Sequence, residues 1–193
     1  AHVLPRQVQV RQDWLDAAGI AMPANLEELE AVFEYFAAND PTGKGNQIVF
    51  LTNWGDGFIN GFLGAYIPTG SQWWLDEEGT LQPYALHAGY KQALEKFNEW
   101  YAKGYIYPES FQIDTNQRKD LLMQNRVVVY NSWYSTVCNA IQGLTGAEPN
   151  AMYQAAVDIV GPNGTGLQTF AKVSENGHVF LARSQNPEAM MRF

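Results

Sequence analysis

The sequence predicts an α/β fold with a mostly parallel sheet covered by helices. Two short, largely apolar runs, residues 47–51 and 126–130, have the length and the β-branched or aromatic side chains of buried strands. Longer stretches around them carry apolar residues three and four positions apart, which is typical of amphipathic helices. Strands that alternate with helices along a chain form a helix-covered, mostly parallel sheet. With 193 residues, the chain can form one domain or two small ones.

Two helices are expected before the first of these strands. Residues 11–19 predict a short helix, with Asp13 near its start and Gly19 as its C-terminal stop. Residues 25–28, Asn-Leu-Glu-Glu, match a capping box that begins a second helix. Four apolar residues fall on one face of that second helix: Leu26, Leu29, Phe33 and Phe36.

The segment after the first strand has weaker signals. Residues 56–66 predict a helix that three glycines weaken. Residues 73–75 and 80–82 flank the turn sequence Asp-Glu-Glu-Gly, which indicates a β-hairpin. Because side chains alternate along a strand, one of Trp73 and Trp74 should face inward and the other outward.

The remaining elements continue the alternation of helices and strands. The clearest helix covers residues 87–103, and further helices are expected at 115–124 and 134–142 on either side of the second strand. Additional strands are expected at 153–160 and 177–182. The apolar stripe of the helix at 87–103 consists of Tyr90, Leu94, Phe97 and Tyr101.

Composition excludes several classes of function. The net charge of −8 and the lack of a basic stripe argue against nucleic-acid binding. The single cysteine, Cys138, excludes an internal disulfide and a cysteine-based metal cluster. No apolar run reaches 18 residues, so no membrane span is expected in this chain. The three histidines are far apart, and we expect no metal site and no cofactor.

One segment resembles a calcium loop but lacks its acidic ligands. Residues 40–45 match part of the pattern D-x-[DN]-x-[DN]-G. Thr42 occupies the third position, Lys44 the fifth and Leu51 the twelfth, where calcium requires oxygen ligands and usually a glutamate. A turn after a helix is therefore the expectation here.

The stretch VVVYNSWY, residues 127–134, is the most informative part of the chain for function. It places Asn131, Trp133 and Tyr134 where a buried strand should end. Ligands of open α/β sheets bind at this edge. Aromatic rings can stack on the C–H face of a sugar while amides and hydroxyls bond its hydroxyl groups. Core packing is the alternative for each ring, since large aromatics dominate cores.

The first strand ends in a similar way. Asn53 and Trp54 follow the strand at 47–51, so two strand ends each provide a tryptophan next to an asparagine. Asp56 completes the candidate ligand-binding set, with a helix N-cap as its alternative role.

Five passages of the chain resemble motifs of bacterial extracellular solute-binding proteins of family 1, the sugar-binding components of ABC importers, similar to maltose-binding proteins. These passages are residues 10–20, 22–29, 90–109, 124–133 and 186–189, and they occur in the family's order. The resemblance implies a periplasmic-binding-protein-like (type II) fold, in which two α/β lobes enclose the ligand around a hinge.

The resemblance also assigns parts of the chain. Residues 1–168 match the second lobe, and residues 169–193 match a hinge-return segment toward the first lobe. Trp133, and Trp54 as the nearest match, take positions where maltose-binding proteins stack aromatic rings on sugar. The implied partners are a carbohydrate, ABC permease subunits and the first lobe of the same protein. The implied location is extracellular, as a membrane-anchored lipoprotein, or periplasmic. A helix start at Asn186, close to the end of the sequence, also suggests part of a longer protein.

The expected function is non-catalytic binding of an oligosaccharide between two lobes. Two alternatives remain open: a glycoside-processing enzyme domain and a lectin-like carbohydrate-binding module. An enzyme would need two carboxylates across a cleft, and Asp13, Asp56 and Asp158 are candidates by residue type alone. No serine-hydrolase, zinc-protease or phosphate-binding motif occurs.

Overall fold

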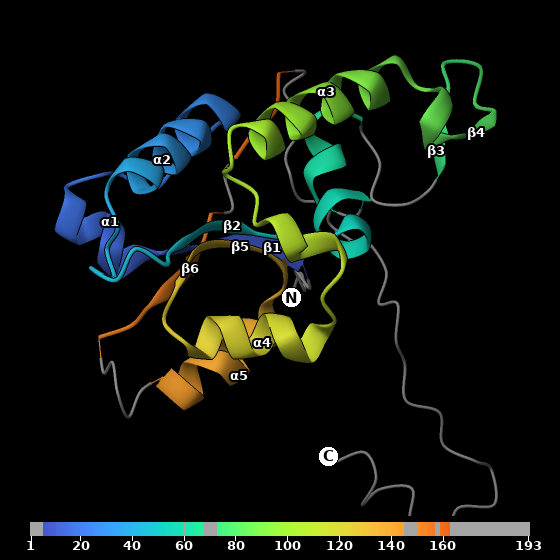
Figure 1. Ribbon diagram of the computed structural model, residues 1–193. Coiled ribbons are helices and arrows are strands. Elements are labelled where there is room, and N and C mark those ends of the chain that lie inside the picture. The colour runs from blue at the N-terminus through green and yellow to red at the C-terminus, as the bar shows by residue number, and fades with distance from the viewer. Residues whose placement is uncertain (1–5, 60, 68–72, 145–149, 157–158, 163–193) are drawn as a thin grey trace, which may run out of the picture.

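The computed structural model describes residues 6–59, 61–67, 73–144, 150–156 and 159–162 (Figure 1). The side chains of residues 6, 7 and 56 are not described. The predicted strand at 177–182, the helix start at Asn186 and the segment 169–193 lie outside the described residues. The division into a lobe of residues 1–168 and a hinge-return segment therefore stays a prediction.

The main sheet has four strands in the order β2–β5–β1–β6. β2 (Ile48–Leu51) and β5 (Val127–Trp133) are parallel. β1 (Arg6–Arg11) lies between β5 and β6 (Tyr153–Ala155) and is antiparallel to both. The predicted α/β class is confirmed. The sheet is mixed, however, because only one of the three pairings among the described strands is parallel.

The difference comes from β1, which the sequence expectation lacks. Its sequence RQVQVR alternates polar and apolar residues, and Val8 and Val10 are buried in the core. Both sheet neighbours of β1 come from distant parts of the chain, so the order of elements does not determine its direction. β2 and β5, in contrast, are joined by a long helical connection, as parallel neighbours require.

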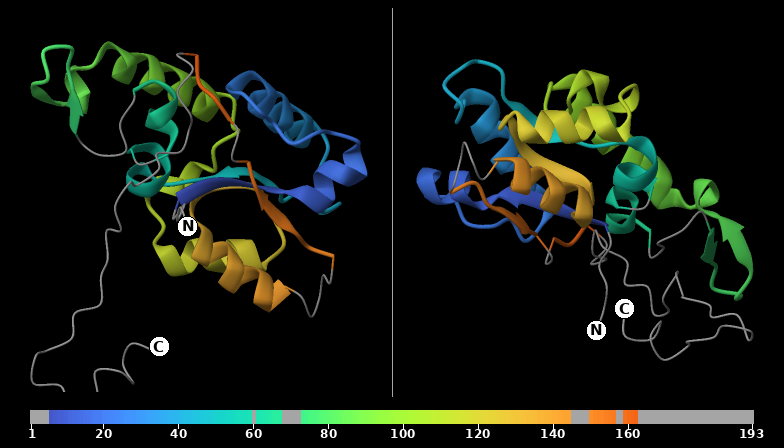
Figure 2. Two further views of the ribbon diagram at one scale, coloured as in Figure 1. Left: turned by 180° about the vertical axis from the view of Figure 1, so that it is seen from behind. Right: turned by 90° about the horizontal axis from the view of Figure 1, so that it is seen from below.

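Helices cover both faces of this sheet. α1 (Gln12–Ala18) and α2 (Leu26–Ala38) lie on one face together with α3 (Ala88–Ala102), while α4 (Thr115–Met123) and α5 (Tyr134–Leu144) lie on the other (Figures 1 and 2). β5 is consequently buried along most of its length, which explains its continuous apolar run.

The predicted helices near the N-terminus are confirmed. Asn25 caps α2 by accepting a hydrogen bond from the backbone N–H of Glu28 at 2.8 Å. Gly19 ends α1 in the left-handed conformation, at φ 69°. The four apolar residues predicted for α2 are all buried: Leu26, Leu29, Phe33 and Phe36.

The apolar face of α3 differs slightly from the predicted stripe. Trp100 is fully buried, whereas Tyr101 is 43% exposed and lies beside Phe111. Phe97 and Trp100 are three positions apart on the inner face and pack in a cluster of aromatic rings around Phe50. The predicted stripe is therefore wrong at one position, because it includes Tyr101 where Trp100 is the buried residue. Both positions carry an aromatic residue, and periodicity alone does not distinguish them.

The predicted hairpin is confirmed as a separate two-stranded sheet of β3 (Trp73–Leu75) and β4 (Leu81–Pro83). Trp73 is 49% exposed, while Trp74 is half-buried with its ring 4.5 Å from that of His87. One tryptophan thus faces solvent and the other faces the protein, as alternation predicts. The short 3-10 helices η3 (Tyr84–Leu86) and η4 (Pro108–Phe111) flank α3 in the sequence.

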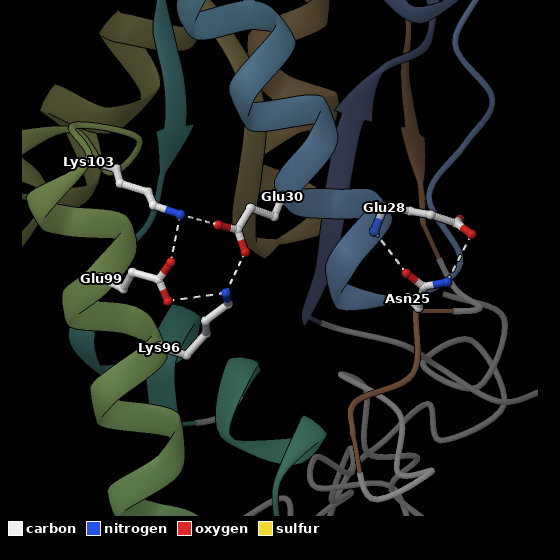
Figure 3. A network of polar contacts seen from close by, with 6 residues as sticks. All are labelled: Asn25, Glu28, Glu30, Lys96, Glu99 and Lys103. Carbon is white, nitrogen blue, oxygen red and sulfur yellow. Dashed lines mark hydrogen bonds and ion pairs between the residues drawn. The ribbon is translucent and has the colours of Figure 1, made fainter.

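An ion-pair network joins α2 to α3 (Figure 3). Glu30 of α2 accepts hydrogen bonds from Lys96 and from Lys103, the latter at 2.6 Å. Glu99 of α3 pairs with the same two lysines, at 3.2 and 2.6 Å. Four charges of alternating sign therefore form a closed ring, and Glu30 is its only member on α2.

The prediction of one helix at residues 56–66 is wrong. The structure has a π-helix, η1 (Trp54–Ile59), and a 3-10 helix, η2 (Phe62–Ala65). The physical reason lies in the contacts of two glycines with β5, which belong to the site at the end of the sheet.

Candidate functional site

The carboxyl ends of β2 and β5 lie at the same edge of the sheet. In their parallel pairing Leu51 is opposite Tyr130. Asn53 and Trp54 follow the end of β2, while β5 continues through Asn131 to Trp133, paired with β1. A hydrogen bond between Asn131 and Gly57 of η1 confirms that the two segments meet.

Trp54 forms a partly exposed aromatic surface at this edge. Its ring stacks on that of Phe58, with ring centroids 4.6 Å apart and an interplanar angle of 15°. Phe58 is completely buried, whereas Trp54 is 44% exposed. We call this pair the aromatic ledge. One face of the indole is supported by the core while the side chain remains accessible, so core packing alone does not explain Trp54.

Trp133 and Tyr134 stand where β5 passes into α5. Trp133 is the last residue of the strand and is half-buried. Tyr134 begins the helix and is 47% exposed. A hydrogen bond with the side chain of Cys138, one turn along the helix, raises the pKa of the Tyr134 phenol above its usual value. Tyr134 therefore remains a neutral hydroxyl at physiological pH.

The two candidate asparagines both bond to Gly57. The Gly57 N–H donates to Oδ1 of Asn53 at 3.0 Å, and the Gly57 carbonyl accepts from Nδ2 of Asn131 at 2.9 Å. Asn131 is only 1% exposed, and Asn53 is half-buried. Asp56 lies in η1, and its side chain is outside the described part of the structure.

Two glycines allow the segment of η1 to approach the strand ends closely. A Cβ on Gly57 would lie 2.0 Å from Oγ1 of Thr52 and 3.1 Å from the carbonyl oxygen of Asn131, and one on Gly61 would lie 2.9 Å from Nδ2 of Asn131. By helix propensity alone, these glycines are weak points of a helix. Their spacing of four residues was the available signal for a face that contacts another segment.

The candidate calcium loop that begins at Asp40 forms a turn in the structure. Among the described residues no group of three or more histidine, cysteine or acidic side chains could hold a metal ion. The Asp40 carboxylate accepts the backbone N–H groups of Thr42, Lys44 and Gly45, at 2.8, 2.8 and 2.6 Å. These bonds are those of a turn stabilised by its first residue.

Of the three carboxylates considered for catalysis by residue type, only Asp13 has a side chain in the described part of the structure. Asp13 forms a bidentate ion pair with Arg11, at 2.8 and 2.7 Å. Asp13 lies in the first turn of α1, and Arg11 at the N-cap position makes no side-chain cap. Asp158 lies outside the described residues.

No helix in the described part of the chain has both the length and the apolar character of a membrane span.

Three curated proteins are similar in sequence to this chain. The polygalacturonan/rhamnogalacturonan-binding protein YtcQ of Bacillus subtilis is 27% identical over 133 residues, which are 66% of this chain and 26% of that protein. The fructooligosaccharide ABC transporter substrate-binding protein FusA of Streptococcus pneumoniae is 26% identical, over 84% of this chain and 30% of its own length. Lipoprotein LipO of Bacillus subtilis is 25% identical, over 91% and 36%.

Solved structures agree on the fold. FusA of S. pneumoniae, as an EF-hand mutant in complex with fructo-nystose, superimposes with a TM-score of 0.69 at 22% identity, covering 91% of this chain and 35% of that one. The alginate-binding protein AlgQ2 without calcium ion gives a TM-score of 0.67 at 17% identity, covering 98% and 40%. These likenesses confirm a periplasmic-binding-protein-like fold.

The chain matches no family model. It spans between about a quarter and two fifths of the length of the proteins it resembles. The resemblance predicted from the motifs is confirmed, because FusA, which is similar in both sequence and structure, is a substrate-binding protein of an ABC transporter. YtcQ and FusA are both named as binding proteins.

Proposed function

We propose that this chain is the sugar-binding second lobe of an extracellular solute-binding protein that delivers an oligosaccharide to an ABC permease. The observation that carries the proposal is the aromatic ledge: Trp54, 44% exposed, stacked on the buried ring of Phe58 at the carboxyl end of β2. Relatives that bind polygalacturonan, rhamnogalacturonan and fructooligosaccharides support the same class of ligand.

In the proposed mechanism the sugar lies with its C–H face on the aromatic rings. Trp54, Trp133 and Tyr134 supply these rings, and the phenol of Tyr134 also offers a hydrogen bond. The first lobe contacts the opposite side of the sugar. The bound sugar favours the closed state because it contacts both lobes only in that state. The permease then recognises the closed form.

The location and the boundaries belong to the same proposal. A relative named as a lipoprotein supports a protein anchored to the outer face of a membrane, or one in the periplasm. Residues 1–168 would form the lobe and residues 169–193 the return to the hinge. A glycoside-processing enzyme and a lectin-like module remain the alternatives, and neither has a specific observation in its favour.

The test is titration of the full-length protein by calorimetry with oligogalacturonides, rhamnogalacturonan fragments and fructooligosaccharides. We expect Trp54→Ala and Trp133→Ala each to weaken binding by about 1–3 kcal/mol, as for buried aromatic anchors. Trp73→Ala is the matched control, because Trp73 is similarly exposed but belongs to the separate hairpin. Circular dichroism would confirm that each variant is folded.

Unchanged affinity in both site variants would remove these rings from the site. Hydrolysis of any of the sugars would favour the enzyme. A full-length protein that binds none of them would contradict the proposed ligand class.

A further inference from the structure

We infer that Asn53 and Asn131 are positioning residues, which clamp the peptide groups of Gly57 and thereby hold the aromatic ledge in place for its ligand. The role of the ledge rests on the proposed function, whereas the clamp itself rests on contacts within the chain. This inference gives the two asparagines a different role from the direct ligand contact that the sequence suggests, a contact that stays a prediction.

The clamp joins the two parallel strands. Asn53 follows β2 and accepts the N–H of Gly57 at 3.0 Å, while Asn131 belongs to β5 and donates to the carbonyl of Gly57 at 2.9 Å. Gly57 is therefore bonded through its N–H to the residue that follows β2 and through its carbonyl to β5. Phe58 adds a bond from its N–H to the carbonyl of Asn53 at 2.9 Å.

The clamp stabilises an unusual backbone conformation. The bond from Phe58 N–H to Asn53 spans five residues, as in a π-helix, a rare conformation that occurs mostly as single turns. Two glycines among its six residues, Gly55 and Gly57, would add to the cost of ordering the segment. Bonds to both peptide groups of Gly57 offset that cost, and they do so at the centre of η1.

Burial favours a supporting role for Asn131 over direct contact with a ligand. The residue is 1% exposed, and its Nδ2 already has a partner. A carbonyl oxygen can only accept, so the atom of Asn131 that faces Gly57 must be its amide nitrogen. Turning that nitrogen toward a ligand would leave the Gly57 carbonyl without its bond, at a cost of about 1–3 kcal/mol.

The clamp acts on the ledge through the chain. Trp54 and Phe58 lie three residues before and one residue after Gly57, and their rings stack on each other. When Gly57 is held against β5, the two rings have a defined position relative to the residues at the end of that strand. A binding surface ordered before its ligand arrives loses less entropy on binding.

The opposite polarity of the two bonds provides a matched pair of variants. Asparagine and aspartate have the same shape, but the aspartate carboxylate accepts and cannot donate. Asn53→Asp keeps the acceptor for the Gly57 N–H. Asn131→Asp loses the donor and places a negative oxygen against the Gly57 carbonyl. The clamp therefore predicts a small effect for the first variant and a large effect for the second.

The experiment uses this chain labelled with 5-fluorotryptophan and observed by fluorine NMR, with the Trp54 resonance assigned from Trp54→Phe. We expect Asn131→Asp to shift or broaden the Trp54 resonance while the resonance of buried Trp100 stays in place. Asn53→Asp should shift the Trp54 resonance less than Asn131→Asp does. This readout needs no sugar, so it distinguishes failure of the clamp from failure of the proposed function.

A second measurement uses the unaltered protein, so it does not depend on the folding of any variant. The Gly57 amide proton and the Asn131 side-chain amide protons should exchange with solvent at least tenfold more slowly than the Gly55 amide proton. In the full-length protein, Asn131→Asp should raise the sugar dissociation constant at least tenfold, and more than Asn53→Asp does. An unshifted Trp54 resonance in Asn131→Asp, or rapid exchange of both groups, would overturn the inference. Weakened sugar binding with an unshifted Trp54 would instead assign Asn131 to the ligand.

Discussion

Neutralising Glu30 should destabilise the fold, because this residue alone connects the ion-pair ring to α2. Burial by itself would raise the pKa of Glu30, but hydrogen bonds from Lys103 and Lys96 outweigh that effect and lower the pKa from 4.5 to about 2. At about 1.4 kcal/mol per pH unit, this interval corresponds to an upper limit of about 3 kcal/mol. The two lysines are 27% and 42% exposed, so solvent screens the network. We therefore expect Glu30→Gln to lower the free energy of unfolding by about 1–2 kcal/mol at pH 7.

The pH dependence gives the direction of the effect. A lowered pKa means that the stabilisation is complete above pH 4.5, where the unfolded chain is also ionised, and is lost as the pH falls toward 2. Urea unfolding at pH 7 and pH 2.5 should show the difference between wild type and Glu30→Gln shrinking by more than half. Glu95→Gln is the control, because Glu95 pairs only with Lys91 of the same helix, at 3.7 Å, and both are well exposed. That variant should stay within about 0.5 kcal/mol of wild type. Equal effects of both variants, or a difference that is independent of pH, would refute this account of the network.

Gly57→Ala should destabilise the chain by about 1–3 kcal/mol in urea unfolding, because the new Cβ would lie 2.0 Å from Oγ1 of Thr52. Gly55→Ala is the control: its Cβ meets no atom within 4 Å, so it should be nearly neutral, and equal effects of the two variants would contradict the contacts described. Calcium should not raise the melting temperature, since Lys44 and Leu51 occupy ligand positions of the loop after α2, and a rise that Asp40→Ala abolishes would disprove this. This chain alone should bind sugar far more weakly than the full-length protein, because it lacks the contacts that the first lobe would make. A loss of about 4 kcal/mol in binding free energy raises the dissociation constant roughly a thousandfold. Equal affinities in calorimetry would favour the lectin-like alternative.

Much of the fold could be predicted because periodicity reports burial directly. The apolar positions of α2 and the continuous apolar runs of β2 and β5 are local properties of the sequence, and the structure buries them as expected. The sequence also places a tryptophan near an asparagine at the end of each of these two strands, and their parallel pairing brings both ends to one edge of the sheet. The direction of β1 was not predictable in this way, since it depends on neighbours more than a hundred residues away.

The conformation of η1 shows where local signals become insufficient. A glycine lowers helix propensity whether it faces solvent or a strand. Gly55 meets open space, while Gly57 meets Thr52 and Asn131, and helix propensity alone does not separate the two cases. The contact with Asn131 spans 74 positions, so the π-helix is a consequence of tertiary packing.

The burial of Arg11 likewise could not be predicted from the sequence. It is 1% exposed, although an arginine at the start of a predicted helix would ordinarily lie in solvent. Its guanidinium lies over the ring of Trp14, 3.8 Å from the centroid, and is bonded to Asp13 and Asn125. Stacking and a bidentate carboxylate satisfy the buried charge, but Asn125 is distant in sequence.

Exposure changes in step along the two strand ends, and this change separates supporting residues from candidate contacts. On the β2 side Thr52 is fully buried and Trp54 is 44% exposed. On the β5 side Asn131 is 1% exposed and Tyr134 is 47% exposed. Within three residues each segment passes from the interior to the surface, so amides and hydroxyls lie one layer below the rings.

This layering is a consequence of the parallel pairing. Leu51 and Tyr130 are opposite each other, so Thr52 and Asn131 lie at the same level, although β2 ends there and β5 continues to Trp133. Because β1 is antiparallel to β5, its first residues lie at this edge, with Arg6 opposite Trp133. In the proposed function, a ligand at this edge meets aromatic surfaces from two chain segments before it can reach a buried amide. The proposal thereby divides the sequence motif into two roles, ligand contact for the rings and support for the amides.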